Sequence, residues 1–550
     1  MRRIMLFLAM CVGIALAAPA GGQTPELELA VLKARLDALE AQNAELRAAV
    51  QQRPQYPVSS PAPQQFAPEI IGPPVSNEQL RSVVEEYMSA NAVSIEAAAA
   101  NVAVEDYEVG SDLKMSATWK DGLELATKNK DFRVHIGGRT QLDVGWFSVD
   151  DNLYVPGPFF TPTPGLGNVY ADGADFRRAR LRIDGTMYEQ IEWAAEYDFV
   201  NSASLGGSAR AFTAPTDLWW MFKELPFVQN LRIGNQKEAM GFEHLVSSRF
   251  QPFIERSFNQ DTFYGGLFNG FLPGIAALGT YGEDDIGTYN IGLFKPTNNV
   301  FAFNTGDGDY ALTGRLTRLL WWEDDGRQLL HLGLSLRQAT AVGTNVGGGA
   351  ANPFRTHQFR TRDALRTGLS ANWPTPANIT LSGDDEQTAN AELVAVNGSF
   401  TLQAEYLVNS LQDARLAAAD PLGNTATYHG GYIQLLYFLT GESDHYSKQN
   451  GFFERVRPAE NFFLVRNSSG CTCFGRGAWQ IGARYNYLDL NDNGLNGGIL
   501  HNATIGVNWF LNPNMKLQWN YIATHRDAPL PGNTGDGLVQ GFGMRFAHDF

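Results

Sequence analysis

The segment RVHIGGRTQLDVGW, residues 133–146, alternates apolar and polar side chains with a period of two. Its apolar positions are Val134, Ile136, Leu142, Val144 and Trp146, and its polar positions include Arg133, His135, Arg139, Gln141 and Asp143. A period of two is typical of a β-strand with one apolar and one polar face. Because charged side chains stand in mid-strand, we expect the polar face to meet water and the opposite face to meet an apolar phase.

The same alternation begins near Leu113 and continues to the end of the chain. It is clearest in the segments 328–338, 399–406, 479–487, 502–509 and 515–521. A further alternating stretch, residues 542–548, places Phe542, Met544, Phe546 and His548 on one face before the chain ends at Phe550. This ending resembles the aromatic terminal strand that outer-membrane barrels present for assembly. The long series of alternating segments predicts an all-β architecture.

Alternation also occurs in soluble sandwiches, so other features must separate the two folds. The polar face carries arginines and carboxylates in mid-strand, which suits a wet lumen better than a solvent-facing sheet with so many aromatic residues opposite. Aromatic pairs stand near predicted strand ends, where interfacial girdles lie in membrane barrels. These pairs are Trp219-Trp220, Trp321-Trp322 and Tyr485/Tyr487. We therefore predict a transmembrane barrel.

The connections fit a barrel with short turns on one side and long loops on the other. The sequence Asn512-Pro513-Asn514 suits a tight turn, and the segments 301–309, 342–366 and 411–427 are long enough for external loops. About 430 residues, at roughly 25 to 30 per strand and its connection, predict about 16 antiparallel strands. The predicted barrel domain spans residues 113–550 and is wide enough for an aqueous channel.

The first 20 residues predict export. Arg2 and Arg3 precede an apolar run that is too short to span a bilayer, and Ala18-Pro19-Ala20 offers a small-residue cleavage site. No later stretch approaches the length of a membrane helix. Residues 1–20 are therefore predicted to be a secretory signal peptide, and the expected location is the bacterial outer membrane.

Several function classes are disfavoured. The formal net charge of −16 argues against a nucleic-acid partner. The segment 489–494 resembles the start of a calcium loop, but position twelve is Leu500 where a bidentate Glu belongs. Cys471 and Cys473, the two cysteines left after signal removal, make neither a disulfide scaffold nor a zinc site. No spacing supports a catalytic triad, so we expect no enzyme activity, no cofactor and no metal.

Residues 21–50 predict a coiled-coil stalk. Its apolar positions recur at alternating spacings of three and four, and they are Leu29, Leu32, Leu36, Leu39, Leu46 and Val50, with Asn43 on the same seam. A buried Asn lowers stability but specifies register and oligomer state. An amphipathic helix that packs on its own barrel is the alternative. Residues 51–75 are rich in proline and predict an extended linker, and residues 76–112 predict a helical or linker segment.

The segment DFRRARLRIDGTMY, residues 175–188, holds the candidate selectivity residues. Arg178, Arg180, Arg182 and Asp184 share one face of the predicted strand. Three guanidiniums would then point into the lumen at intervals of about 6 to 7 Å. Arginine suits anion transfer because its planar donors grip oxyanions and stay charged. In the alternative interpretation, Glu192, Glu196 and Asp198 on the next strand oppose these arginines in an ordinary diffusion pore.

The ordered motifs of the barrel resemble the phosphate-selective porin O and P family. They are DFRVHIGGR at 131–139, FRRA at 176–179, EYDF at 196–199, RIGNQKE at 232–238, Ser247-Ser248 with Glu255-Arg256, YFLTGE at 437–442, AW at 478–479 with ARY at 483–485, LDLND at 488–492 and WFLNP at 509–513. The resemblance runs over nearly all of residues 120–550. It implies a trimer of 16-stranded barrels in which a basic ladder leads to a constriction.

The resemblance also implies an anion-binding set. Matched motif to motif, it consists of Arg177, Arg178, Asp217, Ser247, Ser248 and Arg256, with His244 at the position where phosphate-selective members carry a lysine. A histidine is only partly charged near its usual pKa, which leaves strict phosphate binding open. Arg177 breaks the simple alternation and would turn outward unless it lies at a strand start or on a bulge.

These observations predict a porin with a water-filled, anion-preferring channel for the passive diffusion of small solutes, with phosphate as the candidate selected anion. The expected partners are small anions, outer-membrane lipid and two further copies of the chain in a homotrimer. The N-terminal segment would lie in the periplasm and could reach the cell wall. The alternative function is a general diffusion porin that acts mainly as a structural tether between outer membrane and cell wall.

Overall fold

The computed structural model of the chain describes most of the sequence after residue 106. The described residues are 107–150, 153, 170, 172–201, 212–264, 270–297, 299–306, 308–340, 355–366, 377–416, 423–466, 470, 472–527 and 536–550. The predicted signal peptide, coiled-coil stalk, proline-rich linker and most of segment 76–112 lie outside these residues, and they stay predictions.

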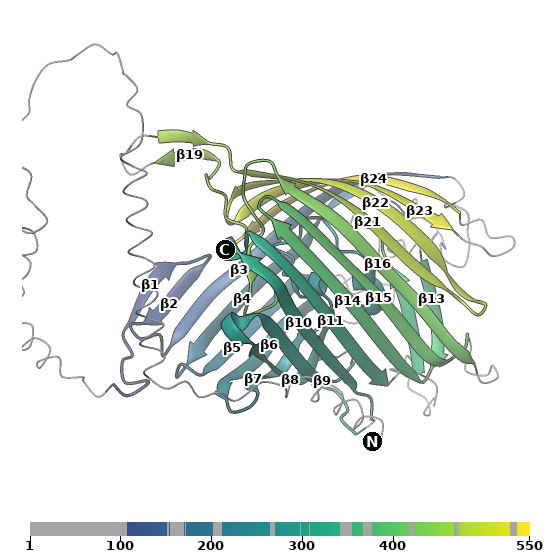
Figure 1. The fold of residues 1–550 in the computed structure, drawn as a ribbon, viewed down its shortest axis with the longest axis horizontal. Coiled ribbons are helices and arrows are strands. Elements are labelled where there is room, and N and C mark those ends of the chain that lie inside the picture. The colour runs from purple at the N-terminus through teal and green to yellow at the C-terminus, as the bar shows by residue number, and fades with distance from the viewer. Residues whose placement is uncertain are drawn as a thin grey trace, which may run out of the picture. The chain divides into compact units, whose positions relative to one another are not determined.

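A closed barrel of sixteen antiparallel strands forms the body of the described chain (Figure 1). Its strands are β3 (Arg133–Val149), β4 (Gly173–Met187), β5 (Ile191–Asn201), β6 (Phe212–Leu225), β7 (Gln229–Lys237), β8 (Phe271–Tyr281), β9 (Gly287–Phe294), β10 (Ala311–Glu323), β11 (Gln328–Thr340), β14 (Asp385–Asn397), β15 (Phe400–Ala414), β16 (Asn424–Phe438), β21 (Ala478–Asp492), β22 (Leu495–Asn512), β23 (Met515–Asp527) and β24 (Gly537–Asp549). The predicted barrel and its strand number are confirmed.

The last strand closes the barrel on the first. β24 pairs with β3 from Val539↔Val149 to Asp549↔Arg139. The final residue continues the ladder, because Phe550 donates its N–H to the carbonyl of Gly138 at 3.1 Å and accepts the N–H of Gly138 at 2.7 Å. Closure gives each of the sixteen strands a paired neighbour on both sides, which is what a sheet that crosses lipid requires.

The predicted faces of the strands are the observed ones. In β24, Phe542 and Phe546 are each 41% exposed on the outer wall, whereas Arg545 between them is 1% exposed inside. The aromatic pair Trp219-Trp220 is a correction. Trp220 is 53% exposed on the outside, but Trp219 is only 8% exposed and faces the lumen, because neighbours along a strand point to opposite sides.

Tight turns and long connections alternate from β3 to β16, after which a long connection leads to β21 and only Asn493 and Gly494 join β21 to β22. β14 and β15 are joined through Gly398 and Ser399, and β22 and β23 through Pro513 and Asn514, as predicted for the latter. The expected external loop at 411–427 is shorter than predicted, since β15 extends to Ala414 and β16 begins at Asn424. Short 3₁₀ segments lie in two further turns, at η4 (Glu283–Asp285) and η5 (Asp324–Gly326).

Two long connections from the same end fold into the lumen. The connection between β7 and β8 holds α4 (Phe242–Leu245) and η2 (Gln260–Tyr264). Glu405, which faces inward from β15, accepts the backbone N–H groups of Phe242 at 2.9 Å and Glu243 at 2.7 Å and so holds α4 against the wall. The connection between β11 and β14 holds a hairpin of β12 (Arg355–Thr361) and β13 (Ala377–Gly383), which packs on the inner wall in one hydrophobic cluster.

A third inward segment comes from the opposite end, between β16 and β21. Its short hairpin of β17 (Tyr446–Ser447) and β18 (Phe452–Phe453) packs against Phe242 of α4, with the rings of Phe242 and Phe453 5.1 Å apart. Arg315 of β10 donates a hydrogen bond to the carbonyl of Gly451 in this hairpin at 2.9 Å. Inserted segments from both ends therefore meet inside the barrel.

Two small hairpins extend the fold at the end where the C-terminus lies (Figure 1). β1 (Met115–Trp119) pairs with β2 (Leu123–Thr127), and β2 pairs with the first residues of β3, so the wall continues past the end of β24. β19 (Phe463–Arg466) pairs with β20 (Thr472–Gly475). Within the described residues, no helix combines the length and apolar character that crossing a membrane requires.

We expect Asp143→Ala to destabilise the barrel by about 3 kcal/mol, because it removes the nearest carboxylate from a buried arginine at the seam and leaves only Glu255, 3.4 Å away. Asp143 accepts two 2.6 Å hydrogen bonds from Arg545, and both side chains are at most 1% exposed. The free energy of unfolding in urea is measured, and the difference in gel mobility between folded and unfolded barrels monitors the unfolding.

The matched control is Asp324→Ala, which removes the partner of Arg327 from a pair whose side chains are 67% and 46% exposed. Exposed pairs contribute about 0 to 1 kcal/mol. Equal losses of stability for Asp143→Ala and Asp324→Ala would contradict the assigned role of the seam pair.

Candidate functional site

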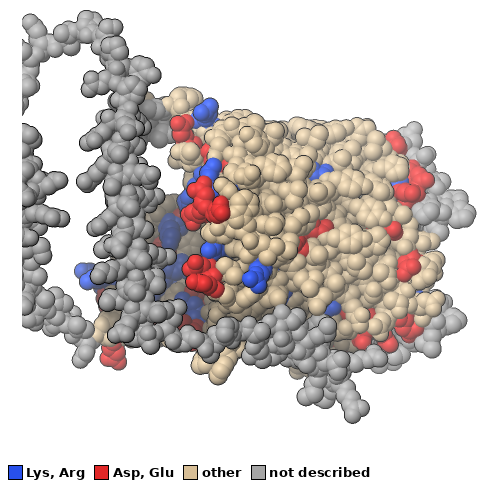
Figure 2. All heavy atoms as spheres, viewed as in Figure 1, with Lys and Arg blue, Asp and Glu red and all other residues tan. Residues whose placement is uncertain are grey.

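A cavity of about 870 Å³ lies inside the barrel, and cationic side chains dominate its lining. Ten cations line it, namely Arg139, Arg178, Arg180, Arg182, Lys223, Arg232, Lys237, Arg249, Arg256 and Arg315. Five acidic residues line it, namely Glu192, Glu196, Asp217, Glu224 and Asp285. Figure 2 shows basic side chains inside the hollow end of the barrel, whereas the visible outer wall is mostly uncharged. The lumen is thus locally basic in a chain whose net charge is −16.

The predicted arginine face of β4 is confirmed. Arg178, Arg180 and Arg182 line the cavity, while Leu181 is 41% exposed on the outer wall. Arg177 also turns inward, because the pairing of β3 with β4 shifts register between Gln141 and Leu142 and leaves Arg177 as the extra residue of a bulge. The bulge resolves the conflict between Arg177 and simple alternation.

Arg177 is nevertheless bound inside the protein instead of facing the cavity. Its Nε donates to Oε1 of Glu255 at 2.7 Å, and Glu255 also lies 3.4 Å from Arg366 and from Arg545. Burial alone would raise the pKa of Glu255, but these arginines hold the pKa well below its usual range. A charged Glu255 therefore neutralises Arg177.

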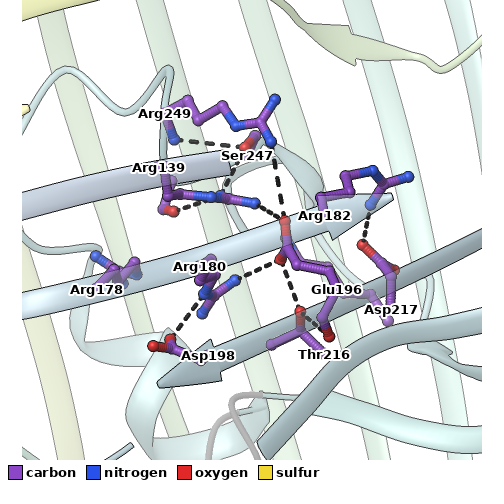
Figure 3. Close-up of polar contacts among 12 residues, drawn as sticks. Arg139, Arg178, Arg180, Arg182, Glu196, Asp198, Thr216, Asp217, Ser247 and Arg249 are labelled. Atoms are coloured by element: carbon purple, nitrogen blue, oxygen red, sulfur yellow. Dashed lines mark hydrogen bonds and ion pairs between the residues drawn. The ribbon is translucent and has the colours of Figure 1, made fainter. Parts of the chain in front are cut away.

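Carboxylates also pair with two members of the arginine series (Figure 3). Arg180 donates to Asp198 at 2.7 Å and to Glu196 at 3.0 Å. Arg182 donates to Asp184 at 2.9 Å and to Asp217 at 2.7 Å. Glu196 and Asp198 thus lie opposite the arginines of β4, where the alternative interpretation of the sequence expected them.

Glu192, the third residue of that alternative, pairs with Lys223 at 3.0 Å instead. Arg178 differs from its neighbours on β4. Its guanidinium donates a 2.8 Å hydrogen bond to the amide oxygen of Gln141, and its Nε has no partner among the described residues. Arg178 is thus a cavity-lining guanidinium with no described carboxylate within ion-pair distance.

The serine pair lies beside Arg139. The sequence predicts this arginine on the polar face of its strand but not in the anion-binding set. Arg139 of β3 donates to the hydroxyls of Ser247 at 3.2 Å and Ser248 at 2.9 Å. It also donates to Glu196. Strand pairing could have placed Arg139 in the site, because Arg139 lies directly opposite Arg180 on the adjacent strand and cross-strand neighbours on one face interact.

His244 does not line the cavity, although Lys237 nearby does. The His244 ring is 2% exposed, its Nδ1 lies 2.9 Å from the amide oxygen of Gln260, and Tyr264 packs against it. Burial lowers the pKa of His244 well below its usual value, and the charge of Lys237 lowers it further. The ring is therefore neutral, and the amine of Lys237 lines the cavity in this part of the site.

The remaining predicted residues have defined places in the cavity. Arg256 donates to the carbonyl of Glu243 at 3.1 Å and to that of Val246 at 2.6 Å, and burial lowers its pKa to about 10. Asp217 accepts the indole N–H of Trp219 at 3.1 Å as well as Arg182. The cavity thus brings together all the predicted anion-binding residues except Arg177 and His244. Among the described residues, no cluster of His, Cys, Asp and Glu could hold a metal ion.

Solved porin structures align with the barrel at low identity. The outer-membrane protein OmpT of Vibrio cholerae is 10% identical with a TM-score of 0.42, and the alignment covers 76% of this chain and 98% of that chain. An anion-selective porin from Comamonas acidovorans is 10% identical with a TM-score of 0.41, and the alignment covers 76% of this chain and 100% of that chain.

Sequence relatives match over most of the chain. Porin O of Pseudomonas aeruginosa is 25% identical over 476 residues, which cover 84% of this chain and 96% of the relative. An uncharacterised protein of Caulobacter vibrioides is 25% identical over 448 residues, which cover 79% of this chain and 77% of the relative. The family described as "Phosphate-selective porin O and P" matches residues 166–550. The match spans more than half of the chain, so this protein belongs to the phosphate-selective porin O and P family and is an outer-membrane porin, not an enzyme.

Proposed function

We propose that this porin forms a water-filled channel that prefers anions, and that phosphate is among the anions it selects. The excess of ten cationic over five acidic side chains around the cavity carries the proposal. Low-dielectric walls focus the field of such charges and raise the local concentration of counter-ions. The negative net charge of the whole chain does not oppose this, because the charges that a solute meets are those of the lumen.

Arg178 is the strongest single candidate for an anion contact. It lines the cavity, keeps a buried Nε without a partner among the described residues and has no described carboxylate within ion-pair distance. The hydroxyls of Ser247 and Ser248 line the same cavity and accept hydrogen bonds from Arg139, which leaves their own protons available to a solute. Guanidinium and hydroxyl donors together suit a tetrahedral oxyanion such as phosphate.

We expect Arg178→Gln to weaken the block of chloride current by phosphate by about tenfold, because a hydrogen bond to a charged group contributes about 1.5 to 3 kcal/mol. The measurement is the half-blocking phosphate concentration of the purified porin in a planar bilayer, together with the reversal potential in a potassium chloride gradient.

The neighbouring substitution Arg177→Gln is the matched control, since Arg177 is bound to Glu255 and does not line the cavity. We expect the half-blocking phosphate concentration to stay within about twofold of wild type, which corresponds to a change in binding free energy well under one kcal/mol. A cation-preferring reversal potential of the wild-type porin would refute the anion preference, and absence of phosphate block would leave a general porin.

We expect His244→Gln to leave the pH dependence of anion block unchanged between pH 5.5 and 8. The pKa of His244 lies well below its usual value, so the ring is already deprotonated across this range and carries no charge to lose. Sulfate is the suitable blocker, since its own charge does not change over this range. A wild-type block that strengthens as pH falls, and that His244→Gln abolishes, would contradict a neutral His244.

A second candidate function, a structural tether, is favoured by the heptad pattern of residues 21–50 and the proline-rich spacer that follows. We propose that the heptad leucines and Asn43 join three copies of the chain and that the stalk extends into the periplasm toward the cell wall. Deletion of residues 21–110 is expected to preserve single-channel conductance while it weakens trimer stability and envelope integrity. Loss of conductance with unchanged envelope integrity would contradict the tether.

A further inference from the structure

Glu196 lies where arginines from three parts of the chain converge (Figure 3). It faces inward from β5, is 0% exposed and lines the cavity. Its carboxylate accepts hydrogen bonds from Arg180 at 3.0 Å and from Arg139, and it lies 3.8 Å from a guanidinium nitrogen of Arg249. A protein carboxylate therefore occupies the point of convergence of three cations.

The other acidic residues of the cavity are held differently. Asp217 has one arginine partner, Arg182, and Glu192 pairs with Lys223. Glu196 is also held by a neutral donor, because the hydroxyl of Thr216 donates to its Oε1 at 2.7 Å. Its surroundings thus combine guanidinium and hydroxyl donors, which is the set that recognises an oxyanion.

The donors around Glu196 exceed what its carboxylate uses. Arg139 is 6% exposed, and its Nε has no partner among the described residues. Arg139 also reaches the hydroxyls of Ser247 and Ser248, which line the same cavity. A phosphate-like oxyanion carries more acceptor oxygens than a carboxylate, so it would satisfy more of these donors than Glu196 does.

We propose that Glu196 is a tethered competitor in an oxyanion site formed by Arg139, Arg180 and Arg249 with the serine pair, and that a permeating phosphate-class oxyanion displaces it. This inference rests on the proposed anion-channel function. The exchange involves no covalent step, because one anion leaves the arginines as another arrives. A channel needs binding that is favourable enough for entry and weak enough for release, and an internal anion that returns to the site speeds release.

The test compares wild-type porin with Glu196→Gln and Glu196→Asp in planar bilayers, with inorganic phosphate as the blocker of chloride current. Glu196→Gln removes the competing charge, and we expect the half-blocking phosphate concentration to fall by about tenfold, the effect of one charge-assisted hydrogen bond. Glu196→Asp keeps the charge but shortens its reach by one methylene, and we expect a fall of about threefold on the same scale. In the presence of phosphate, interruptions of the single-channel chloride current should last longer in both variants because phosphate leaves more slowly.

Glu192→Gln is the matched control. Glu192 also faces the cavity from β5, but it pairs with Lys223 and has no ion pair with the three arginines of the site, so we expect its phosphate block to stay within about twofold of wild type. Thr216→Val supplies a variant that keeps every charge in place. It removes one hydrogen bond that holds Glu196, and we expect phosphate block to tighten by about threefold. It also tests the proposal should either Glu196 variant fail to fold.

Three results would overturn the tethered competitor. Glu196→Gln could tighten the block while Glu196→Asp and Thr216→Val behave like wild type, which would show a simple effect of net charge. All three variants could bind phosphate as weakly as wild type or more weakly. Glu192→Gln could tighten the block as much as Glu196→Gln. A wild-type porin without anion preference would instead refute the proposed function itself, and the variants would then show no phosphate block to compare.

Discussion

The closure of β24 on β3 is the constraint on which the rest of the structure depends. A strand in lipid must satisfy every backbone N–H and C=O within the sheet, so the wall is stable only as a complete cylinder. The seam is reinforced from inside by Asp143 and Arg545, which face each other across the last pair of strands, and Arg545 also donates to the carbonyl of Ile254 at 2.6 Å. The same side chain that secures the seam thus anchors the inserted segment between β7 and β8, and barrel closure and pore shape are coupled.

Closure creates a lumen whose inward positions are largely polar and in part charged, and the inserted segments supply much of the countercharge. Glu255 takes up Arg177, Glu243 lies 3.2 Å from Arg484, and Asp261 pairs with Arg362 at 2.7 Å. Buried charges of one sign are costly, so arginines in a narrowed channel require carboxylates close by. The pairing leaves a smaller number of guanidinium donors facing the cavity, and the proposed anion preference rests on these donors.

This balance explains how a basic channel can conduct. A row of unpaired arginines would hold an oxyanion through several charge-assisted hydrogen bonds and release it slowly. Arg180 and Arg182 are each shared with two carboxylates, so an incoming anion gains less at each step than it would from a free guanidinium. Lys237 adds a cation beside the serine pair, where its ammonium also donates to the carbonyl of His244 at 2.5 Å.

The sequence by itself determined the barrel, the approximate strand number and the inward face of Arg178, Arg180 and Arg182, because a period of two is a local property that each strand carries independently. Only the tertiary structure decided which guanidiniums remain free. The bulge that turns Arg177 to Glu255, the burial of His244 and the approach of Ser248 to Arg139 each join residues 78 or more positions apart or depend on an inserted segment. Such contacts are set by barrel closure and by how the connections fold inside it, and no local pattern encodes them.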